Sequence, residues 1–296
     1  MSDPRLTPFN GRVAHVSLEG QVDAEQFCAG EHLQIACTKA PLLRVPDGPI
    51  DRELLFGRKF LALDATSAAP WVYGIADRDG YCGWVHGKML VDVRKATHTV
   101  AVRESYLKVT PDLKTTERTF PAFLGSELSV TDVVGGWSRI GHEQSSTSDQ
   151  QTFYMPTCHL RPVSKHARDP IEVARLFLGT PYLWGGNSGR GIDCSGLVQA
   201  AFHDCGFACP GDSDLQEAMP GERLGEDVEL VSGDLIFWRG HVALVAGQDM
   251  LIHTNAHHMN TVEEPVADAV ARIAASDTGP VTSRLRPKRV KLPAIC

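Results

Sequence analysis

The sequence predicts an α+β domain preceded by two small all-β barrels, and three observations support this. From about residue 30 to 163, short apolar runs alternate with Gly, Pro, Asp and Ser, which is typical of short strands joined by turns. A loose internal repeat divides this region into two similar parts. After residue 164, helical patterns come first and a run of strands follows, which is the order found in α+β domains.

The repeat sets the predicted domain boundaries. Its first copy contains LLRVPD, FLALD, WVYGI and GYCGWVHGKML, and its second contains YLKVTPD, LSVTD, GWSRI and TFYMPTCHL in the same order. We therefore expect an N-terminal arm at 1–29, all-β domains at 30–95 and 96–164, and the α+β domain at 165–296. Within the last domain, DPIEVARLFLGT, the stretch after Asp193, and VADAVARIAA are predicted helices, and VTSRLRPKRV is a predicted closing strand.

Composition and charge exclude several classes of protein. The formal net charge is −7 and the pI about 5.9, which argues against a nucleic-acid binder. The N-terminus has no positive segment followed by an apolar stretch, and no run of about 18 apolar residues occurs, so neither a secretory signal nor a membrane span is expected. We expect a cytoplasmic protein that binds no membrane.

The eight cysteines are scattered through the chain. In a long chain without an export signal, reduced thiols are the better interpretation. Cys205 and Cys209 form a close pair, but no second pair stands at a matching spacing, so no metal and no cofactor are expected.

Cys194 lies between a glycine-rich stretch and a predicted helix. Backbone N–H groups at a helix start favour a thiolate, so the residue is a candidate nucleophile with an expected low pKa. His241 begins the strand HVALVAG, and His253 lies in the following strand, after the turn GQD. Antiparallel pairing would bring the two imidazoles together, so that one could orient the other. For any single Cys or His, ordinary packing is the alternative.

The segments GTPYLWGGNSGRGIDCSGLVQ, GDLIFWRGHVALV and LIHTNA resemble the NlpC/P60 family of cell-wall cysteine peptidases, over about 168–290. The resemblance implies a papain-like α+β fold with Cys194 as nucleophile, His241 as general base and acid, and His253 as the orienting residue. It also implies that Tyr182 assists the oxyanion and that Asp193 and Ser195 contact the substrate. Packing would equally explain Tyr182, and helix capping would equally explain Asp193 or Ser195.

Two all-β domains of bacterial SH3-like type before such a domain look like the γ-D-glutamyl-diamino-acid endopeptidases of murein peptide recycling. This resemblance implies cleavage of free peptides such as L-Ala-γ-D-Glu-mesoDAP that carry an unblocked N-terminal L-Ala, as in dipeptidyl-peptidase VI. The sequence leaves open whether mesoDAP or Lys occupies the third position, what the second SH3-like domain does, and the oligomeric state.

The same resemblance implies residues that bind the substrate amine. Asp212 and Ser213, in GDSDLQ, match an Asp-Ser segment that holds this amine, and Tyr81, in DGYCGWV, matches a tyrosine over the pocket. Arg58 stands where the family often has an acid, and Glu53 is a possible substitute. The alternatives are a helix N-cap for Asp212 and Ser213 and a core aromatic for Tyr81.

Two other functions remain to be tested against this one. The protein could hydrolyse intact peptidoglycan, with the SH3-like domains as wall anchors, or it could be a non-enzymatic peptide-binding module. The complete set of Cys194, His241 and His253 argues against the second of these, because a decayed site would lose a member.

Overall fold

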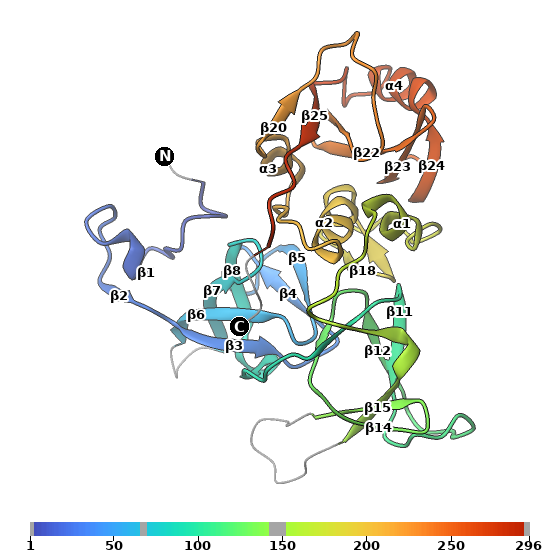
Figure 1. The fold of residues 1–296 in the computed structure, drawn as a ribbon. Helices are drawn as coiled ribbons and strands as arrows, with labels where there is room; N and C mark the ends of the chain where they lie inside the picture. Colours follow the sequence, from blue (N-terminus) through green and yellow to red (C-terminus); the bar gives the residue numbers. More distant parts are fainter. Residues whose placement is uncertain (1–2, 66–69, 142–151, 293–296) are drawn as a thin grey trace. The chain divides into compact units, whose positions relative to one another are not determined.

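The structure, a computed structural model, describes residues 3–65, 70–141 and 152–292. The chain forms two compact units that meet in the sequence at Lys165 and His166 (Figure 1). The first unit is built from strands, and the second combines helices with an antiparallel sheet. Within the described ranges, no helix is long and apolar enough to cross a membrane.

The first part of the N-terminal unit is a seven-stranded antiparallel sheet. Its hydrogen-bonded order is β5-β4-β8-β7-β6-β3-β9. The strands are β3 (Glu31–Ile35), β4 (Lys39–Leu43), β5 (Ile50–Leu55), β6 (Lys59–Ala65), β7 (Trp71–Ala76), β8 (Cys82–His86) and β9 (Leu90–Asp92). Alternate residues of these strands, among them Ile35, Leu42 and Phe60, are fully buried in one apolar core.

The second part has its own core and repeats the pairing pattern of the first. Its strands are β10 (His98–Val100), β11 (Glu104–Leu107), β12 (Phe120–Phe123), β13 (Glu127–Leu128), β14 (Val130–Val134), β15 (Trp137–Ile140), β16 (Phe153–Pro156) and β17 (Leu160–Pro162). The pairs β11-β12, β14-β15-β16 and β10-β17 correspond to β4-β5, β6-β7-β8 and β3-β9. The repeated segments of the sequence therefore occupy equivalent elements, including a 3₁₀ turn after β8 and after β16.

The two all-β parts pack closely against each other at Gly57 and Glu127. Gly57 has φ +75°, and a Cβ placed there would lie 1.9 Å from the carbonyl oxygen of Glu127. The neighbouring Arg58 Nη1 donates to Glu127 Oε1 at 2.9 Å, and Arg78 Nη2 donates to the same oxygen at 2.6 Å. Arg58 therefore forms an ion pair inside this unit.

The N-terminal segment, for which the sequence predicts an arm, contains regular secondary structure. Its short strands β1 (Val13–His15) and β2 (Gln26–Cys28) pair in parallel. Val13 is buried in a small cluster with Leu63, Tyr73 and Cys82. The segment is thus fixed to the first sheet by burial of apolar surface.

The second unit contains a six-stranded antiparallel sheet with the order β20-β25-β21-β22-β23-β24. The strands are β20 (Gly221–Arg223), β21 (Leu235–Trp238), β22 (His241–Gly247), β23 (Met250–Asn255), β24 (Asn260–Pro265) and β25 (Ser283–Pro287), and a short hairpin pairs β18 (Asn187–Ser188) with β19 (Gly191–Ile192). The helices are α1 (Pro170–Arg175), α2 (Cys194–Asp204), α3 (Ser213–Glu217) and α4 (Val266–Ala274). The α+β fold class is confirmed.

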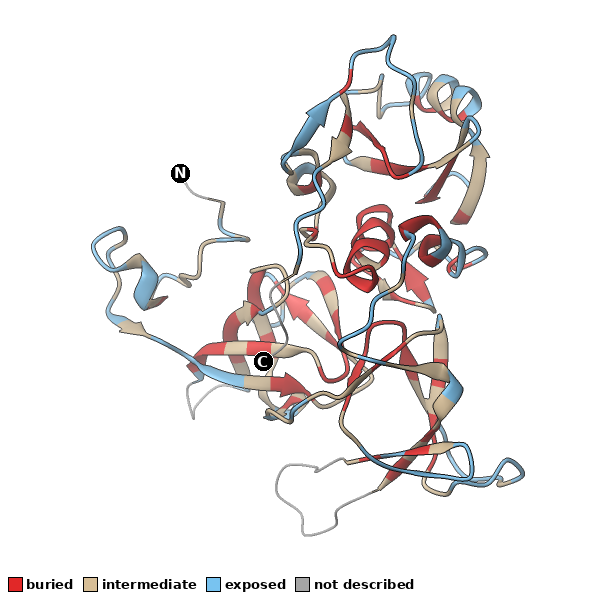
Figure 2. Cartoon of the chain, in the orientation of Figure 1, coloured by how far each residue is buried: buried red, intermediate tan, exposed pale blue. Residues whose placement is uncertain are grey.

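Local chemistry explains where these helices begin. The Asp169 carboxylate accepts the N–H of Ile171, and Pro170 occupies the first helical position of α1. Helix α2 is buried along almost its whole length (Figure 2) and contacts β22 and β23. Ala269 and Ile273 of α4 pack on Trp238 and its neighbours in the sheet. The start of α2 is therefore held against the strands that carry both candidate histidines.

Candidate active site

Cys194 is the first residue of α2, as its sequence context predicts. Asp193 is the N-cap, and its Oδ1 accepts the N–H of Gly196 at 2.6 Å. A Cβ at residue 196 would lie 2.6 Å from Asn187 Oδ1 and 2.7 Å from the Gly186 carbonyl oxygen. Glycine at this position thus lets the helix start pack closely on the preceding loop, which fixes the position of Cys194.

His241 and His253 lie on the neighbouring strands β22 and β23. The predicted turn between them is present, with positive φ at Gln248 and Asp249. Leu244 pairs with Ile252, so the two histidines lie on one face of the sheet at diagonal positions. Nε2 of His241 is 2.9 Å from Nδ1 of His253. The predicted contact between the two imidazoles is therefore present in the structure.

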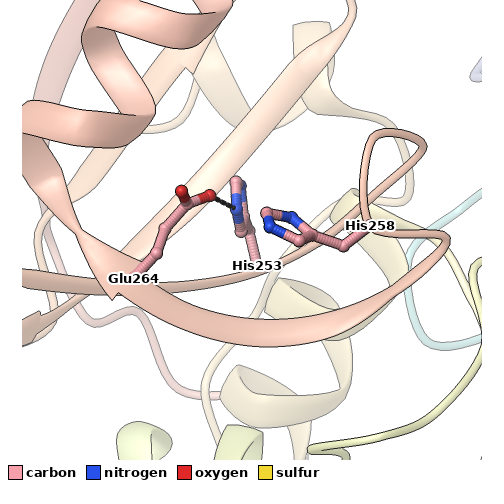
Figure 3. Close-up of side chains that lie close together, drawn as sticks. All are labelled: His253, His258 and Glu264. Carbon is pink, nitrogen blue, oxygen red and sulfur yellow. Dashed lines mark hydrogen bonds and ion pairs between the residues drawn. The ribbon is translucent and has the colours of Figure 1, made fainter.

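The far side of His253 contacts a carboxylate that the sequence reasoning missed. Nε2 of His253 is 2.6 Å from Glu264 Oε1, on β24 (Figure 3). Arg272, on α4, donates to the same oxygen. Burial would raise the pKa of Glu264, but the hydrogen bond to His253 and the nearby positive charge outweigh burial and lower it. Glu264 is thus an ionised acceptor beside a fully buried imidazole.

These contacts define the proton positions that general-base chemistry requires. If Nε2–H of His253 donates to Glu264, Nδ1 of His253 accepts from Nε2–H of His241. The remaining nitrogen of His241, Nδ1, then carries a lone pair and can take a proton. Asn255 Nδ2 also lies 2.8 Å from Nε2 of His253, so the opposite tautomer of His253 has a partner too. The Glu264 charge and the shorter distance favour the first arrangement.

The thiol of Cys194 differs from the expectation of a low pKa. Burial, together with the charge of Asp193, raises its pKa to about 12. Backbone N–H groups of Val242, Ser195 and Cys194 itself favour the thiolate but do not compensate. Burial also lowers the pKa of His241 to about 3. The resting pair is therefore a neutral thiol and a neutral imidazole, with the sulfur at the backbone of Val242, next to His241.

Tyr182 lies within electrostatic range of Cys194. Burial, together with smaller effects of Cys194 and Asp193, raises the pKa of Tyr182 to about 12. Its backbone N–H donates to the Met259 carbonyl and fixes the loop at this point. A hydroxyl that stays protonated at neutral pH can donate to a developing oxyanion.

Asp193 and Ser195 serve the helix start. Oδ2 of Asp193 accepts the N–H of Gly185, and Ser195 Oγ donates to Oδ1 of Asp193. Capping therefore accounts for both side chains, and contact with substrate stays a prediction. The Ser195 carbonyl accepts from Nε2 of the fully buried Gln216, on α3, a contact that the sequence did not reveal.

Asp212 and Ser213 lie at the start of α3. Asp212 is the N-cap residue and Ser213 the first helical residue, yet the Asp212 side chain makes no capping hydrogen bond within the described part of the chain. The capping alternative is thus weakened for Asp212. Because Gln216 joins α3 to the start of α2, this pair is held in the same unit as Cys194.

Tyr81 and Glu53 belong to the other unit. Tyr81 is buried in the core of the first sheet, with the guanidinium of Arg52 5.0 Å from its ring centroid. Glu53, on β5, forms an ion pair with Lys39, on β4. These contacts support the core-aromatic interpretation of Tyr81, and a role for either residue at the substrate stays a prediction.

A thiol at a helix start, an imidazole on an adjoining strand and a second imidazole that orients it define a papain-like cysteine peptidase. The family comparison agrees. Residues 179–273 match the NlpC/P60 family, and residues 42–90 match the bacterial dipeptidyl-peptidase SH3 domain.

Relatives match over different lengths. The γ-D-glutamyl-L-lysine dipeptidyl-peptidase of Bacillus subtilis is 30% identical over 70% of this chain and 73% of its own length. Dipeptidyl-peptidase 6 of Lysinibacillus sphaericus is 37% identical, but the match spans only 36% of that protein and 32% of this chain. An NlpC/P60 family structure from Bacillus cereus matches 89% of this chain and 100% of its own, with a TM-score of 0.69 and 19% identity, which shows the fold. The chain belongs to the NlpC/P60 family of cysteine peptidases.

Proposed function

We propose that the protein hydrolyses the amide bond between γ-D-Glu and the diamino acid of free murein peptides that carry an unblocked N-terminal L-Ala. The observation that carries this proposal is the Bacillus subtilis relative named for γ-D-glutamyl-L-lysine peptides. Its match covers 70% of the chain, which is more than the second unit alone can supply, so it extends into the all-β unit.

The proposed mechanism uses the neutral thiol–imidazole pair. Cys194 attacks the amide carbonyl while its proton moves to Nδ1 of His241, so the thiolate forms only as the new C–S bond forms. Backbone N–H groups at the start of α2 and the Tyr182 hydroxyl receive the oxyanion. His241 then protonates the leaving amine, and a water molecule that it activates releases the acyl group from sulfur.

His253 and Glu264 support this proton transfer. As His241 gains a proton, the imidazolium is stabilised through His253 by the Glu264 carboxylate. Arg272 holds Glu264 in place. We propose His253 and Glu264 as positioning residues, because they act through His241.

Specificity for a free amine is proposed to come from Asp212 and Ser213, with Tyr81 and Glu53 as candidate contributions of the first unit. A carboxylate in a closed pocket selects an ammonium group, since a blocked terminus would leave the carboxylate without a counter-ion. Peptides that are still attached to the cell wall lack this amine. A role in the recycling of free peptides, in the cytoplasm, follows from such specificity and is part of the proposal.

Mass spectrometry of the products of L-Ala-γ-D-Glu-mesoDAP, its L-Lys counterpart and their N-acetylated forms tests the proposal. We expect cleavage of the free-amine peptides only, lost in Cys194→Ala and retained in Cys158→Ala, a matched exposed cysteine in the other unit. Equal cleavage of the acetylated peptides would refute amine selection and favour hydrolysis of intact peptidoglycan. Failure to cleave any γ-D-glutamyl amide would refute the proposed function.

A further inference from the structure

A cluster of possible metal ligands lies around His253. One ring nitrogen of His253, one of His258 and a carboxylate oxygen of Glu264 lie within 4.8 Å of one another (Figure 3), and Nε2 is the nitrogen of His253 that contacts Glu264. His253 is fully buried, Glu264 is partly buried, and His258 lies on the exposed loop between β23 and β24. The group is therefore anchored in the sheet at one end and open to solvent at the other.

The donor set is that of a transition-metal site. Two imidazoles and one carboxylate are common ligands of Zn²⁺, with bonds of about 2.0–2.2 Å and a fourth position open to water. Tetrahedral coordination needs ligand atoms roughly 3.3 Å apart, so both the exposed His258 ring and the Glu264 carboxylate have to shift to take an ion. Nδ1 of His258 already contacts Asn255 Oδ1 at 3.1 Å, which leaves its Nε2 for the ion.

Glu264 can take part without losing Arg272. Within the described residues, His253 and Arg272 both contact the same carboxylate oxygen of Glu264, Oε1. Oε2 is thus the oxygen that can move to a metal while the ion pair with Arg272 is kept. An ion between Glu264 and His253 would replace the hydrogen bond that now joins them.

We propose that His253, His258 and Glu264 bind a divalent transition-metal ion such as Zn²⁺, and that the bound ion switches the peptidase off. The inhibitory part rests on the proposed function, whereas the binding site does not. The reason for inhibition is the tautomer of His253. A metal needs the lone pair of Nε2, so the proton of His253 must reside on Nδ1.

The change of tautomer at His253 also changes the tautomer of His241. With a proton on Nδ1, His253 donates to Nε2 of His241 across the 2.9 Å contact. His241 then carries its own proton on Nδ1 and has no lone pair to accept the proton of Cys194. The metal therefore removes the general base without touching the thiol. Asn255 Nδ2 lies 2.8 Å from Nε2 of His253 and can donate to that nitrogen whenever this tautomer forms without a bound metal.

Binding is tested first, with Co²⁺ as the probe and Cys194→Ala as the background, so that the thiol cannot act as a ligand. Visible absorption and calorimetry follow the titration. We expect one Co²⁺ per chain, and a loss of affinity of at least about tenfold when His258→Ala is added. The matched control is His257→Ala, since His257 is an adjacent exposed histidine outside the group. Equal Co²⁺ binding by the two histidine variants, or no binding at all, would overturn the proposal.

Inhibition is tested next, in chains that keep Cys194. Without metal, His258→Ala should keep the wild-type rate, because the backbone N–H of residue 258 still holds Asn255. Added Zn²⁺ should inhibit the wild type and His257→Ala at the same concentrations, and His258→Ala only at concentrations at least about tenfold higher. Unchanged inhibition of His258→Ala would place the inhibitory ion elsewhere and refute the switch. Because Co²⁺ binding is measured without catalysis, failure of the metal site is distinguishable from failure of the proposed activity.

Discussion

His253 and Glu264 share a 2.6 Å hydrogen bond that sets which nitrogen of His253 carries its proton. Through the 2.9 Å contact with His241, the same bond sets which nitrogen of His241 is free to act as a base. A carboxylate on β24 thus controls a proton that is transferred at the start of β22. The relationship makes Glu264 the first residue to test.

Glu264→Gln should lower kcat/KM by at least about tenfold. The amide keeps the size of the side chain but loses its charge, and its NH₂ group can donate to Nε2 of His253, which stabilises the wrong tautomer. Steady-state kinetics on the γ-D-glutamyl peptide measure the effect. Glu263→Gln is the control, because Glu263 pairs with Arg175 instead of a catalytic residue. Full activity of a folded Glu264→Gln protein would contradict the role of Glu264.

The contribution of Glu264 illustrates what the sequence could and could not predict. A helix start and two strands around a tight turn are local patterns that make Cys194, His241 and His253 candidates, and resemblance to the family predicts their roles. Glu264 depends on the pairing of β23 with β24, where His253 lies opposite Val262 and Glu264 is the next residue on that face. Period-2 alternation in TVEEP was the available signal, but the sequence alone did not fix the register.

Local sequence patterns also could not predict how deeply a side chain is buried. A helix start predicts a low thiol pKa, and the N–H donors that would cause it are present. The structure buries Cys194 under β22, and this desolvation outweighs the donors. Tyr81 shows the same limit, since its buried position depends on how residues from several strands of the first sheet pack into one core.

Tyr182→Phe should lower kcat by about 10²–10³ with little change in KM, because the hydroxyl is proposed to bind the oxyanion and not the ground-state substrate. The ring stays in place, so packing is preserved. Steady-state kinetics separate the two constants. A variant with normal kcat and raised KM would instead assign Tyr182 to substrate binding.

Alkylation of Cys194 by iodoacetamide should be slow at neutral pH and should rise about tenfold per pH unit from 7 to 10. The pKa of about 12 means that the thiolate fraction is small throughout this range. Peptide mass spectrometry follows the modification of Cys194, with Cys158, which is exposed, as an internal comparison. A plateau near neutral pH would reveal a preformed thiolate and contradict the neutral pair.

The same raised pKa predicts how stability depends on pH. The folded protein holds the Cys194 proton up to about pH 12, whereas an unfolded chain releases it near the ordinary value of 9.0. Its contribution is therefore fully present below pH 9 and is lost as pH rises toward 12. Urea titrations at pH 8 and pH 10.5 should show a smaller loss of unfolding free energy for Cys194→Ala than for the wild type, and equal losses would contradict the burial of the thiol.

Glu127→Ala should destabilise the N-terminal unit by about 3–5 kcal/mol, because it leaves Arg58 and Arg78 without their shared carboxylate at a largely buried junction. Urea unfolding followed by tryptophan fluorescence measures the change, since Trp71, Trp84 and Trp137 all lie on strands of this unit. Glu117→Ala, at an exposed position of the same unit, should stay within about 0.5 kcal/mol of the wild type. If both variants behaved alike, the two arginines would have found water or other partners, and the ion pairs could not be what holds the two all-β parts together.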